Sequence, residues 1–373
     1  MRVIVVGSGI VGASCAYHAA RSGAEVILVE SDLPGRATAA GAGIVCPWTS
    51  RVDDEAWHQF AAVAAERYPT LIEQLADSGH ADVGYRKVGA LSLFPTVEER
   101  DQFQRSLLHA HADTPEMGAV QALSSEEATA LFPPLAPDTW AVHVAGAARV
   151  DGRSLRQALL AQAITAGARL ETGSARLWAS RHRVQGVTVG STDIDADVVV
   201  AATGAWTDQF LQPTGVSLGV RPQRGQIVHL NVAPADTRGW PAVVPTQSSH
   251  YMLAFDDSRI VAGATRETGA GFDYRVTAGG LAEVLREALT IAPGLATATH
   301  LETRIGFRPM GPDIRPLLGT IDGQENLVVA TGLGASGLTM GPLAGEIAST
   351  IALGKPADLD LTPFDPLRAA SRS

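Results

Sequence analysis

A glycine-rich turn near the start of the chain constrains the fold more than any other stretch. The β-branched run 3–6 leads into Gly7, Gly9 and Gly12, which are spaced G-x-G-x-x-G and precede an Ala-rich, helix-forming segment. A second apolar run follows and ends at Glu30. The order of strand, tight turn, helix, strand and acid is typical of a nucleotide-binding βαβ unit, so this stretch predicts an α/β fold built on a parallel sheet.

Each residue of this pattern has a physical role. Gly7 allows the chain to turn sharply, Gly9 lets the backbone approach a pyrophosphate, and Gly12 lets the helix pack close to the strand. The N–H groups at the start of the helix favour phosphate, and Glu30 is spaced to bind a ribose hydroxyl. The pattern predicts a dinucleotide site and leaves open whether the dinucleotide is NAD or FAD.

Composition limits the partners and the location that we expect. The 373 residues are 46% hydrophobic and carry a formal charge of −10, with a pI near 5.5 and no long basic run. We therefore expect a sizeable core and no nucleic-acid partner. Cys15 and Cys46 show neither metal-ligand spacing nor a disulfide framework, so we expect no metal site and a reduced, cytoplasmic setting. The first strand starts at residue 2, which predicts no signal peptide, and no apolar run is long enough for a transmembrane segment.

Hydrophobic periodicity predicts three long helices. One covers 53–79, with an interruption expected near Pro69, where the ring removes a backbone donor. An amphipathic helix is expected over 151–166, and another helix over 338–353.

Continuous apolar runs at 198–202 and 327–331 suit strands that are covered on both faces. Nucleotide-type βα features therefore occur in three places: at the start, over about 145–220, and at the end. Between them lie two mixed segments rich in strands. This arrangement predicts one domain inserted twice into another.

Five further motifs extend the pattern over nearly the whole chain. They are the small-residue stretch 38–43, the segment 149–151, the strand and turn 198–206, the stretch 306–313 with 316–319, and the loop and helix 332–345. In this order they resemble the motifs of the D-amino-acid oxidase superfamily of flavoproteins. The most similar subgroups are glycine oxidase, sarcosine oxidase and the bacterial D-amino-acid dehydrogenases, and residues 308–310 and 338–340 favour the dehydrogenases.

This resemblance implies the domain organisation. We expect a Rossmann-type, glutathione-reductase-like FAD-binding domain, with an inserted α+β substrate domain made of a mixed antiparallel sheet and helices. The expected ranges are 1–48, 140–220 and 313–365 for the FAD-binding domain, 49–139 and 221–312 for the substrate-binding domain, and 366–373 for a disordered tail.

The resemblance also identifies the dinucleotide as FAD. The residues that it implies for FAD binding are Gly7, Gly9, Ile10, Val11, Gly12, Glu30, Ser31, Thr38, Ala39, Ala40, Gly43, Ile44, Ala175, Thr203, Gly204, Trp206, Gly334, Ala335, Ser336, Gly337, Leu338 and Thr339. A helix N-terminus near the flavin would stabilise the negative charge of its reduced form. No cysteine lies in 304–312, where monomeric sarcosine oxidases attach their flavin, so FAD is expected to be non-covalent.

Two residues match those with which the family binds its substrate. Arg308 matches the arginine that binds the substrate carboxylate, and a planar guanidinium donates two parallel hydrogen bonds to such a group. Tyr251 matches the tyrosine that helps to hold the same carboxylate, with a core or rim position as the alternative. His250 should point to the opposite strand face, and we expect a structural or rim role for Arg224.

The implied reaction is oxidation of the Cα–N bond of a small amino acid by hydride transfer to flavin N5, which gives an imine that is hydrolysed to a 2-oxo acid. The amino acid is a D-amino acid, glycine, or an N-substituted one such as sarcosine or a hydroxyproline. Oxidation of a 2-hydroxy acid or a secondary amine, and a role as flavin subunit of a hetero-oligomeric amine dehydrogenase, remain alternatives.

The electron acceptor stays open at this point. Glycine oxidases carry His and Arg where this chain has Leu333 and Ala335, so one charged neighbour of the flavin is missing. Beyond the amino-acid substrate, the partners left open are a second copy of the chain and an electron-accepting protein.

Overall fold

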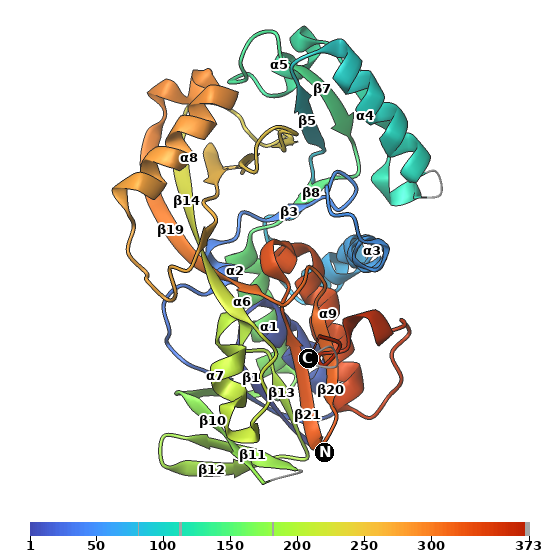
Figure 1. The fold of residues 1–373 in the computed structure, drawn as a ribbon, viewed down its shortest axis with the longest axis vertical. Coiled ribbons are helices and arrows are strands. Elements are labelled where there is room, and N and C mark those ends of the chain that lie inside the picture. Colours follow the sequence, from blue (N-terminus) through green and yellow to red (C-terminus); the bar gives the residue numbers. More distant parts are fainter. Residues whose placement is uncertain (81, 112–113, 181–182, 370–373) are drawn as a thin grey trace.

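The structure is a computed structural model that describes residues 1–80, 82–111, 114–180 and 183–369. Figure 1 shows a six-stranded sheet in its lower half and a nine-stranded sheet in its upper half. The first strand, β1, lies inside the six-stranded sheet between β13 and β2. The N-terminal segment is therefore central to the fold.

The six-stranded sheet has the order β20-β21-β13-β1-β2-β9. Its strands are β1 (Arg2–Val6), β2 (Glu25–Glu30), β9 (Arg169–Thr172), β13 (Val198–Ala201), β20 (Leu317–Ile321) and β21 (Gln324–Thr331). Neighbours pair in parallel except β20, which pairs antiparallel with β21 at one edge. Val3, Ile4 and Val5 are fully buried, because both faces of the sheet are covered. The strands predicted at 198–202 and 327–331 are confirmed.

Three helices cover one face of this sheet. They are α1 (Ile10–Arg21), α6 (Gly152–Thr165) and α9 (Gly337–Ala352). Helix α1 packs against both α6 and α9, and their apolar side chains form one core with Val3 and Val5 of β1. The predicted helices at 151–166 and 338–353 are confirmed to within one residue at each end.

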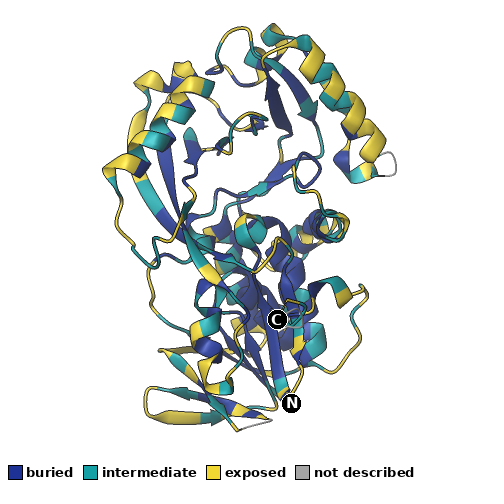
Figure 2. Ribbon diagram, viewed as in Figure 1, coloured by how far each residue is buried: buried dark blue, intermediate teal, exposed yellow. Residues whose placement is uncertain are grey.

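A small antiparallel sheet and a short helix cover the opposite face. They are β10 (Ala175–Ala179), β11 (Val184–Val189), β12 (Thr192–Asp195) and α7 (Thr207–Leu211). Ile4 and Val6 of β1 pack here with Leu177 and Val187. Figure 2 shows the resulting buried layer in dark blue.

The nine-stranded sheet runs β18-β14-β17-β16-β15-β5-β7-β6, with β19 paired to β14. Its strands are β5 (Ala90–Phe94), β6 (Val120–Leu123), β7 (Trp140–Val144), β14 (Arg221–Asn231), β15 (Ala242–Val243), β16 (Tyr251–Ala254), β17 (Arg259–Gly263), β18 (Glu267–Thr268) and β19 (Thr299–Met310). The β5–β15 pair is parallel and the other pairs are antiparallel.

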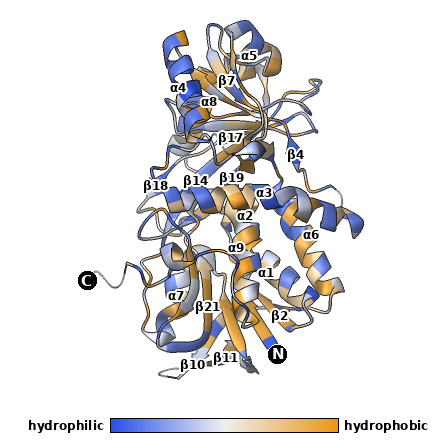
Figure 3. Ribbon diagram, turned by 90° about the vertical axis from the view of Figure 1, so that its right-hand side faces the viewer, coloured by the Kyte–Doolittle hydropathy of each residue, from blue (hydrophilic) through white to orange (hydrophobic). Residues whose placement is uncertain are grey.

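Helices cover parts of the mixed sheet. Helix α8 (Ala278–Ile291) packs against β14 and β17, and α4 (Val97–Ala110) packs against β5, β6 and β7. A capping box at Ser124 starts α5 (Ser125–Leu131). Figure 3 shows that α4 is largely hydrophilic, whereas α9 and the parallel strands are hydrophobic. This contrast reflects one-sided burial of α4 and deep burial of α9.

A second small sheet lies between the two large ones in Figure 1. It consists of β3 (Ile44–Val45), β8 (Ala148–Arg149) and β4 (Arg86–Lys87). Arg149 is 1% exposed, pairs with Asp256, and lies 4.9 Å from the centre of the Phe255 ring. A buried charge held in this way ties β8 to the segment after β16.

The predicted α/β class, with a parallel sheet and a mixed antiparallel sheet plus helices, is confirmed. The exact domain boundaries stay a prediction. Among the described residues, no helix combines the length and the hydrophobicity that spanning a bilayer requires.

The interruption expected near Pro69 is wrong. One continuous helix, α3 (Glu55–Asp77), contains Pro69 in its interior. The proline removes one backbone hydrogen bond, but buried side chains continue on both sides of it, among them Phe60, Tyr68 and Leu75. Burial of this apolar face outweighs the lost bond.

The tail predicted at 366–373 is partly wrong. Residues 366–369 form a turn in which Arg368 donates hydrogen bonds to Asp313 at 2.6 and 3.0 Å and to the carbonyl oxygen of Pro316 at 3.0 Å. These contacts hold the turn against the loop after β19. Residues 370–373 lie outside the described residues.

Gly345 lies where α9 crosses α1 at close range. A Cβ added there would lie 2.3 Å from the Val11 carbonyl oxygen and 2.6 Å from the Ser14 Cβ. We expect Gly345→Ala to lower the free energy of unfolding by about 1–3 kcal/mol, because overpacking forces backbone shifts. Gly279→Ala in α8 is the matched control, since a Cβ there meets nothing within 4 Å. Urea unfolding followed by circular dichroism compares them, and equal stability of the two variants would contradict the packing argument.

Candidate functional site

A cavity of about 660 Å³ lies at the carboxyl ends of the parallel strands and reaches the mixed sheet. Its lining includes Val6, Glu30 and Thr331 from the ends of β1, β2 and β21, and Tyr251 and Arg308 from β16 and β19. Open α/β sheets bind ligands in a crevice at this edge. The cavity therefore joins the nucleotide-type part of the chain to the β-rich part.

The turn after β1 brings backbone atoms closer together than a side chain would permit. Gly7 has a φ of +94°, and a Cβ there would lie 2.4 Å from the Ala202 carbonyl oxygen. A Cβ on Gly12 would lie 1.8 Å from the Gly7 carbonyl oxygen. Gly12 thus serves the packing of α1 on the turn, whereas Gly7 and Gly9 line the cavity.

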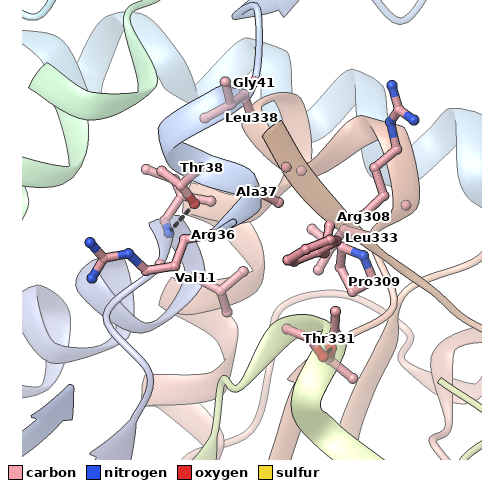
Figure 4. Close-up of a pocket in the computed structure, with 18 of the residues that line it drawn as sticks. Val11, Arg36, Ala37, Thr38, Gly41, Arg308, Pro309, Thr331, Leu333 and Leu338 are labelled. Atoms are coloured by element: carbon pink, nitrogen blue, oxygen red, sulfur yellow. Dashed lines mark hydrogen bonds between the residues drawn. The ribbon is translucent and has the colours of Figure 1, made fainter. Parts of the chain in front are cut away.

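Helix α1 begins at the cavity. Gly9 is its N-cap and has no side chain to cap the first N–H groups. The hydroxyl of Thr38, on the short helix α2 (Ala37–Ala40), accepts a hydrogen bond from the Ile10 N–H at 2.9 Å (Figure 4). The positive end of α1 lies beside this hydroxyl, which is an arrangement suited to an anion such as a diphosphate.

Glu30 is held by three donors at the end of β2. Its carboxylate accepts hydrogen bonds from the Ser8 N–H at 3.1 Å, from Arg36 at 2.7 Å and from Arg156 at 3.2 Å. Sequence reasoning found Glu30 but neither arginine. Arg36 directly precedes the small-residue stretch, which is a usable local signal, whereas Arg156 comes from α6, 126 positions away along the chain.

Helix α9 also begins at the cavity. A 3₁₀ turn, Gly334–Ser336, leads into it, and Ser336 makes no side-chain cap. The Thr339 hydroxyl donates to the Ile44 carbonyl oxygen at 3.0 Å, and the Tyr68 hydroxyl donates to that of Leu338. The first turn of α9 is thereby fixed with its positive end towards the cavity.

Arg308 extends from β19 at the opposite side of the cavity from Arg36 (Figure 4). Its Nη1 donates to the Thr265 carbonyl oxygen at 2.9 Å and to the Gln223 Oε1 at 3.2 Å. A Cβ on Gly225 would lie 2.9 Å from the guanidinium, so this glycine leaves the space in which the charge lies. Neutral oxygens therefore orient Arg308 without neutralising it.

Tyr251 lies next to Arg308. Its ring packs over Gly263 of the neighbouring strand, where a Cβ would lie 3.2 Å from the hydroxyl oxygen. Burial raises the pKa of Tyr251, although Arg308 opposes the rise. The phenol therefore keeps its proton at neutral pH and is able to donate it in a hydrogen bond to an anion.

The other candidates lie outside the cavity lining. His250 is buried and lies 3.4 Å from a carboxylate oxygen of Glu283, which agrees with the predicted opposite face. Arg224 is buried against Glu267 at 3.1 Å and Asp273 at 2.9 Å, so of the two roles expected for it the structural one applies.

The structure brings nearly all predicted site residues together. All of them except Gly12 and Ala39 line the cavity. The carbonyl oxygen of Ala39 instead accepts a hydrogen bond from Arg153 at 2.8 Å. Among the lining residues that sequence reasoning missed are Arg36 and Arg266.

The chain is similar over almost its whole length to known proteins. A family model described as DAO, FAD dependent oxidoreductase, matches residues 2–351. The chain is 46% identical over 367 residues to the uncharacterized oxidoreductase YurR of Bacillus subtilis (strain 168), with 98% of each chain covered. It is 30% identical over 370 residues to a glycine oxidase of Geobacillus kaustophilus (strain HTA426), with 97% of this chain and 95% of the relative covered.

Solved structures agree with these similarities. The structure of iminodiacetate oxidase from Chelativorans sp. BNC1 matches with a TM-score of 0.95 at 47% identity, covering 98% of this chain and 99% of that one. The structure of glycine oxidase from Geobacillus kaustophilus matches with a TM-score of 0.85 at 28% identity, covering 98% and 99%.

The chain belongs to the DAO family of FAD-dependent oxidoreductases. The predicted superfamily is therefore confirmed. The likeness of residues 308–310 and 338–340 to D-amino-acid dehydrogenases stays a prediction.

The cavity of this DAO-family oxidoreductase fits FAD. Two helix N-termini, those of α1 and α9, lie along one cavity, and the backbone at Gly7 passes too close to Ala202 to admit a side chain. Glu30 lies where β2 ends, and Ala175 lines the same end of the cavity. Anion-binding helix ends and a carboxylate for a ribose are the groups that a dinucleotide requires.

Both cysteine thiols lie in environments that keep them protonated. Burial raises the pKa of Cys15 to about 12, and burial also raises the pKa of Cys46. Because the thiolate is the nucleophile, we expect both thiols of the folded protein to resist an aromatic disulfide reagent at pH 8. In denaturant two thiols should react, and Cys46→Ser should reduce that number to one. Rapid stoichiometric labelling of the folded protein would contradict the assignment.

Proposed function

We propose that this oxidoreductase oxidises the Cα–N bond of a small amino acid whose carboxylate is bound by Arg308 and Tyr251. The observation that carries the proposal is the guanidinium of Arg308. Within the described residues it forms no ion pair, and its hydrogen-bond acceptors are the neutral oxygens of Thr265 and Gln223. Its positive charge is therefore available to a substrate carboxylate.

The proposed chemistry divides between cofactor and protein. FAD, when bound, supplies the two-electron oxidation by accepting a hydride at N5. The forked guanidinium of Arg308 fixes the plane of the carboxylate, and the protonated Tyr251 hydroxyl donates a further hydrogen bond to it. Oxidation converts the Cα–N single bond into an imine, which water hydrolyses to a 2-oxo acid and an amine or ammonia.

The lining offers no evident base for this reaction. Among the described residues that line the cavity there is no histidine, and the carboxylates of Glu30 and Asp313 are each paired with an arginine. A substrate that binds with a neutral amine needs no proton acceptor for loss of the α-hydrogen as hydride. Orientation of the substrate is then the main contribution of the protein.

An N-substituted amino acid is the favoured substrate among the three kinds expected. Support comes from the 47% identity to iminodiacetate oxidase, whose name describes a secondary amine with carboxylates. The similarity to glycine oxidase at 30% identity supports a small α-carbon substituent. Within the described residues, no specific observation favours a 2-hydroxy acid or a second subunit.

We further propose that FAD binds non-covalently and that the protein is cytoplasmic. Cys15 lies within α1 and is fully buried, and no cysteine occurs on β19 beside the cavity. Two free thiols, of which Cys15 is buried and Cys46 is half-buried, suit a reducing compartment. Precipitation with acid should release all the flavin into solution.

Replacement of Arg308 tests the proposed function. The variant Arg308→Leu should keep its flavin but lower kcat/KM by about 100-fold or more, since removing one partner of a buried charge pair costs about 2–5 kcal/mol. The assay is anaerobic bleaching of flavin absorbance by sarcosine, glycine, iminodiacetate, D-amino acids and hydroxyprolines, followed by readmission of air. Arg304→Leu is the control, because Arg304 lies on the same strand and pairs with Glu302 at 2.6 Å. Full activity of Arg308→Leu on carboxylate substrates would refute the assignment.

Tyr251→Phe tests the second carboxylate contact. It should raise KM about 10-fold with a smaller change in kcat, since one hydrogen bond to a charged group is worth about 1.5–3 kcal/mol. Because burial raises the pKa of Tyr251, the phenol stays a donor below that raised value. The difference in KM between the two proteins should therefore persist up to about pH 10, the ordinary tyrosine value, and disappear only above it. A difference that vanishes between pH 7 and 9 would mean that another group titrates.

A further inference from the structure

Arg266 lies near the groups that we propose bind the substrate carboxylate. It occupies the short segment between β17 and β18, is exposed, and lines the same cavity as Arg308. It directly follows Thr265, whose carbonyl oxygen accepts a hydrogen bond from Arg308 at 2.9 Å. Its positive charge opposes the rise that burial causes in the pKa of Tyr251, and it adds to the lowering that burial causes in the pKa of Arg308.

Arg266 has no compensating partner. In the part of the chain that the structure describes, its guanidinium makes no hydrogen bond and no ion pair. The adjacent Glu267 is already engaged, because it accepts hydrogen bonds from Arg224 at 3.1 Å, from Gln226 at 2.7 Å and from the Thr265 hydroxyl at 2.7 Å. The charge of Arg266 is thus free to act in the cavity.

The carboxylates that line the cavity do not neutralise either arginine at this end. Within the described lining they are Glu30 and Asp313, and each pairs with a different arginine, at 2.7 and 2.6 Å respectively. Arg308 and Arg266 therefore present two positive charges to the substrate. One substrate carboxylate would compensate Arg308 and leave Arg266 uncompensated.

We propose that Arg266 binds a second carboxylate, so that the preferred substrate is a dicarboxylic amino or imino acid. The proposal rests on the proposed function, because it adds a second contact to a substrate already held by Arg308. A guanidinium binds carboxylate through two parallel hydrogen bonds, and the attraction is stronger in a cavity than in bulk water. The second carboxylate ends either an N-substituent, as in iminodiacetate, or a side chain, as in D-aspartate and D-glutamate.

The test changes the charge on both sides of the contact. Iminodiacetate is compared with its monoamide, in which one carboxylate becomes a neutral amide of similar size, and with sarcosine. Wild-type enzyme should show a KM for iminodiacetate at least about 10-fold below that for the monoamide, as one charge-assisted contact implies. In Arg266→Gln this difference should fall to about twofold or less, while kcat and the KM for sarcosine change little. D-aspartate and D-glutamate, tested beside D-alanine, distinguish a side-chain carboxylate from one on nitrogen.

A matched variant excludes a general charge effect. Arg286→Gln on α8 removes an arginine that is also exposed but does not line the cavity, and it should leave the preference for the dicarboxylate unchanged. The proposal is overturned if wild-type enzyme treats iminodiacetate and its monoamide alike. It is also overturned if Arg266→Gln raises KM equally for iminodiacetate and sarcosine, which would indicate a structural role.

An inert ligand separates failure of this proposal from failure of the proposed function. If no amine bleaches the flavin of wild-type enzyme, the proposed function is wrong. The binding role of Arg266 is then judged by the melting temperature of the holoenzyme with malonate or acetate. A larger rise with malonate that Arg266→Gln abolishes would support a dicarboxylate site, and equal shifts in both proteins would refute it.

Discussion

The close approach of backbone segments around α1 is the constraint on which the rest of the structure depends. Gly12 packs on the turn at Gly7, and Gly345 of α9 packs on the backbone of α1 at Val11. Each contact is too short for a side chain. Because both helices start at the carboxyl edge of the parallel sheet, these contacts bring two positive helix ends to one cavity. The site proposed for the dinucleotide therefore depends on how tightly three backbone segments pack.

The mixed sheet supplies the opposite end of the cavity through one long strand pair. Strands β14 and β19 pair with Gln223 opposite Arg308, and this register carries the guanidinium over Gly225. The acceptors of Arg308 are uncharged, so the sheet fixes the direction of the side chain without neutralising its positive charge. A carboxylate partner from the protein would have neutralised the charge on which substrate binding depends.

The sequence predicts best those features that local patterns specify. Three such features are confirmed: the tight turn at the glycines after β1, the buried strand at 198–202 and the helix at 338–353. Each follows from local backbone geometry or from the spacing of apolar residues. Pro69 shows the limit, because local propensity predicted a break where packing of the buried face holds one helix together. The ion pair of Glu30 with Arg156 joins segments far apart in sequence, and no local pattern encodes such a contact.

The positions of the two substrate-side arginines suggest how specificity is divided. Arg308 lies within a paired strand and over Gly225, so the sheet fixes where its guanidinium lies. Arg266 lies in the connection between β17 and β18, and its side chain makes no hydrogen bond or ion pair with the described residues. Its replacement therefore alters the charge of the cavity without altering the sheet. Loops carry function that a rigid scaffold positions, and this arrangement follows that principle. Arg308, on the strand, then positions the substrate for the reaction, and Arg266, in the loop, determines how many carboxylates the substrate carries.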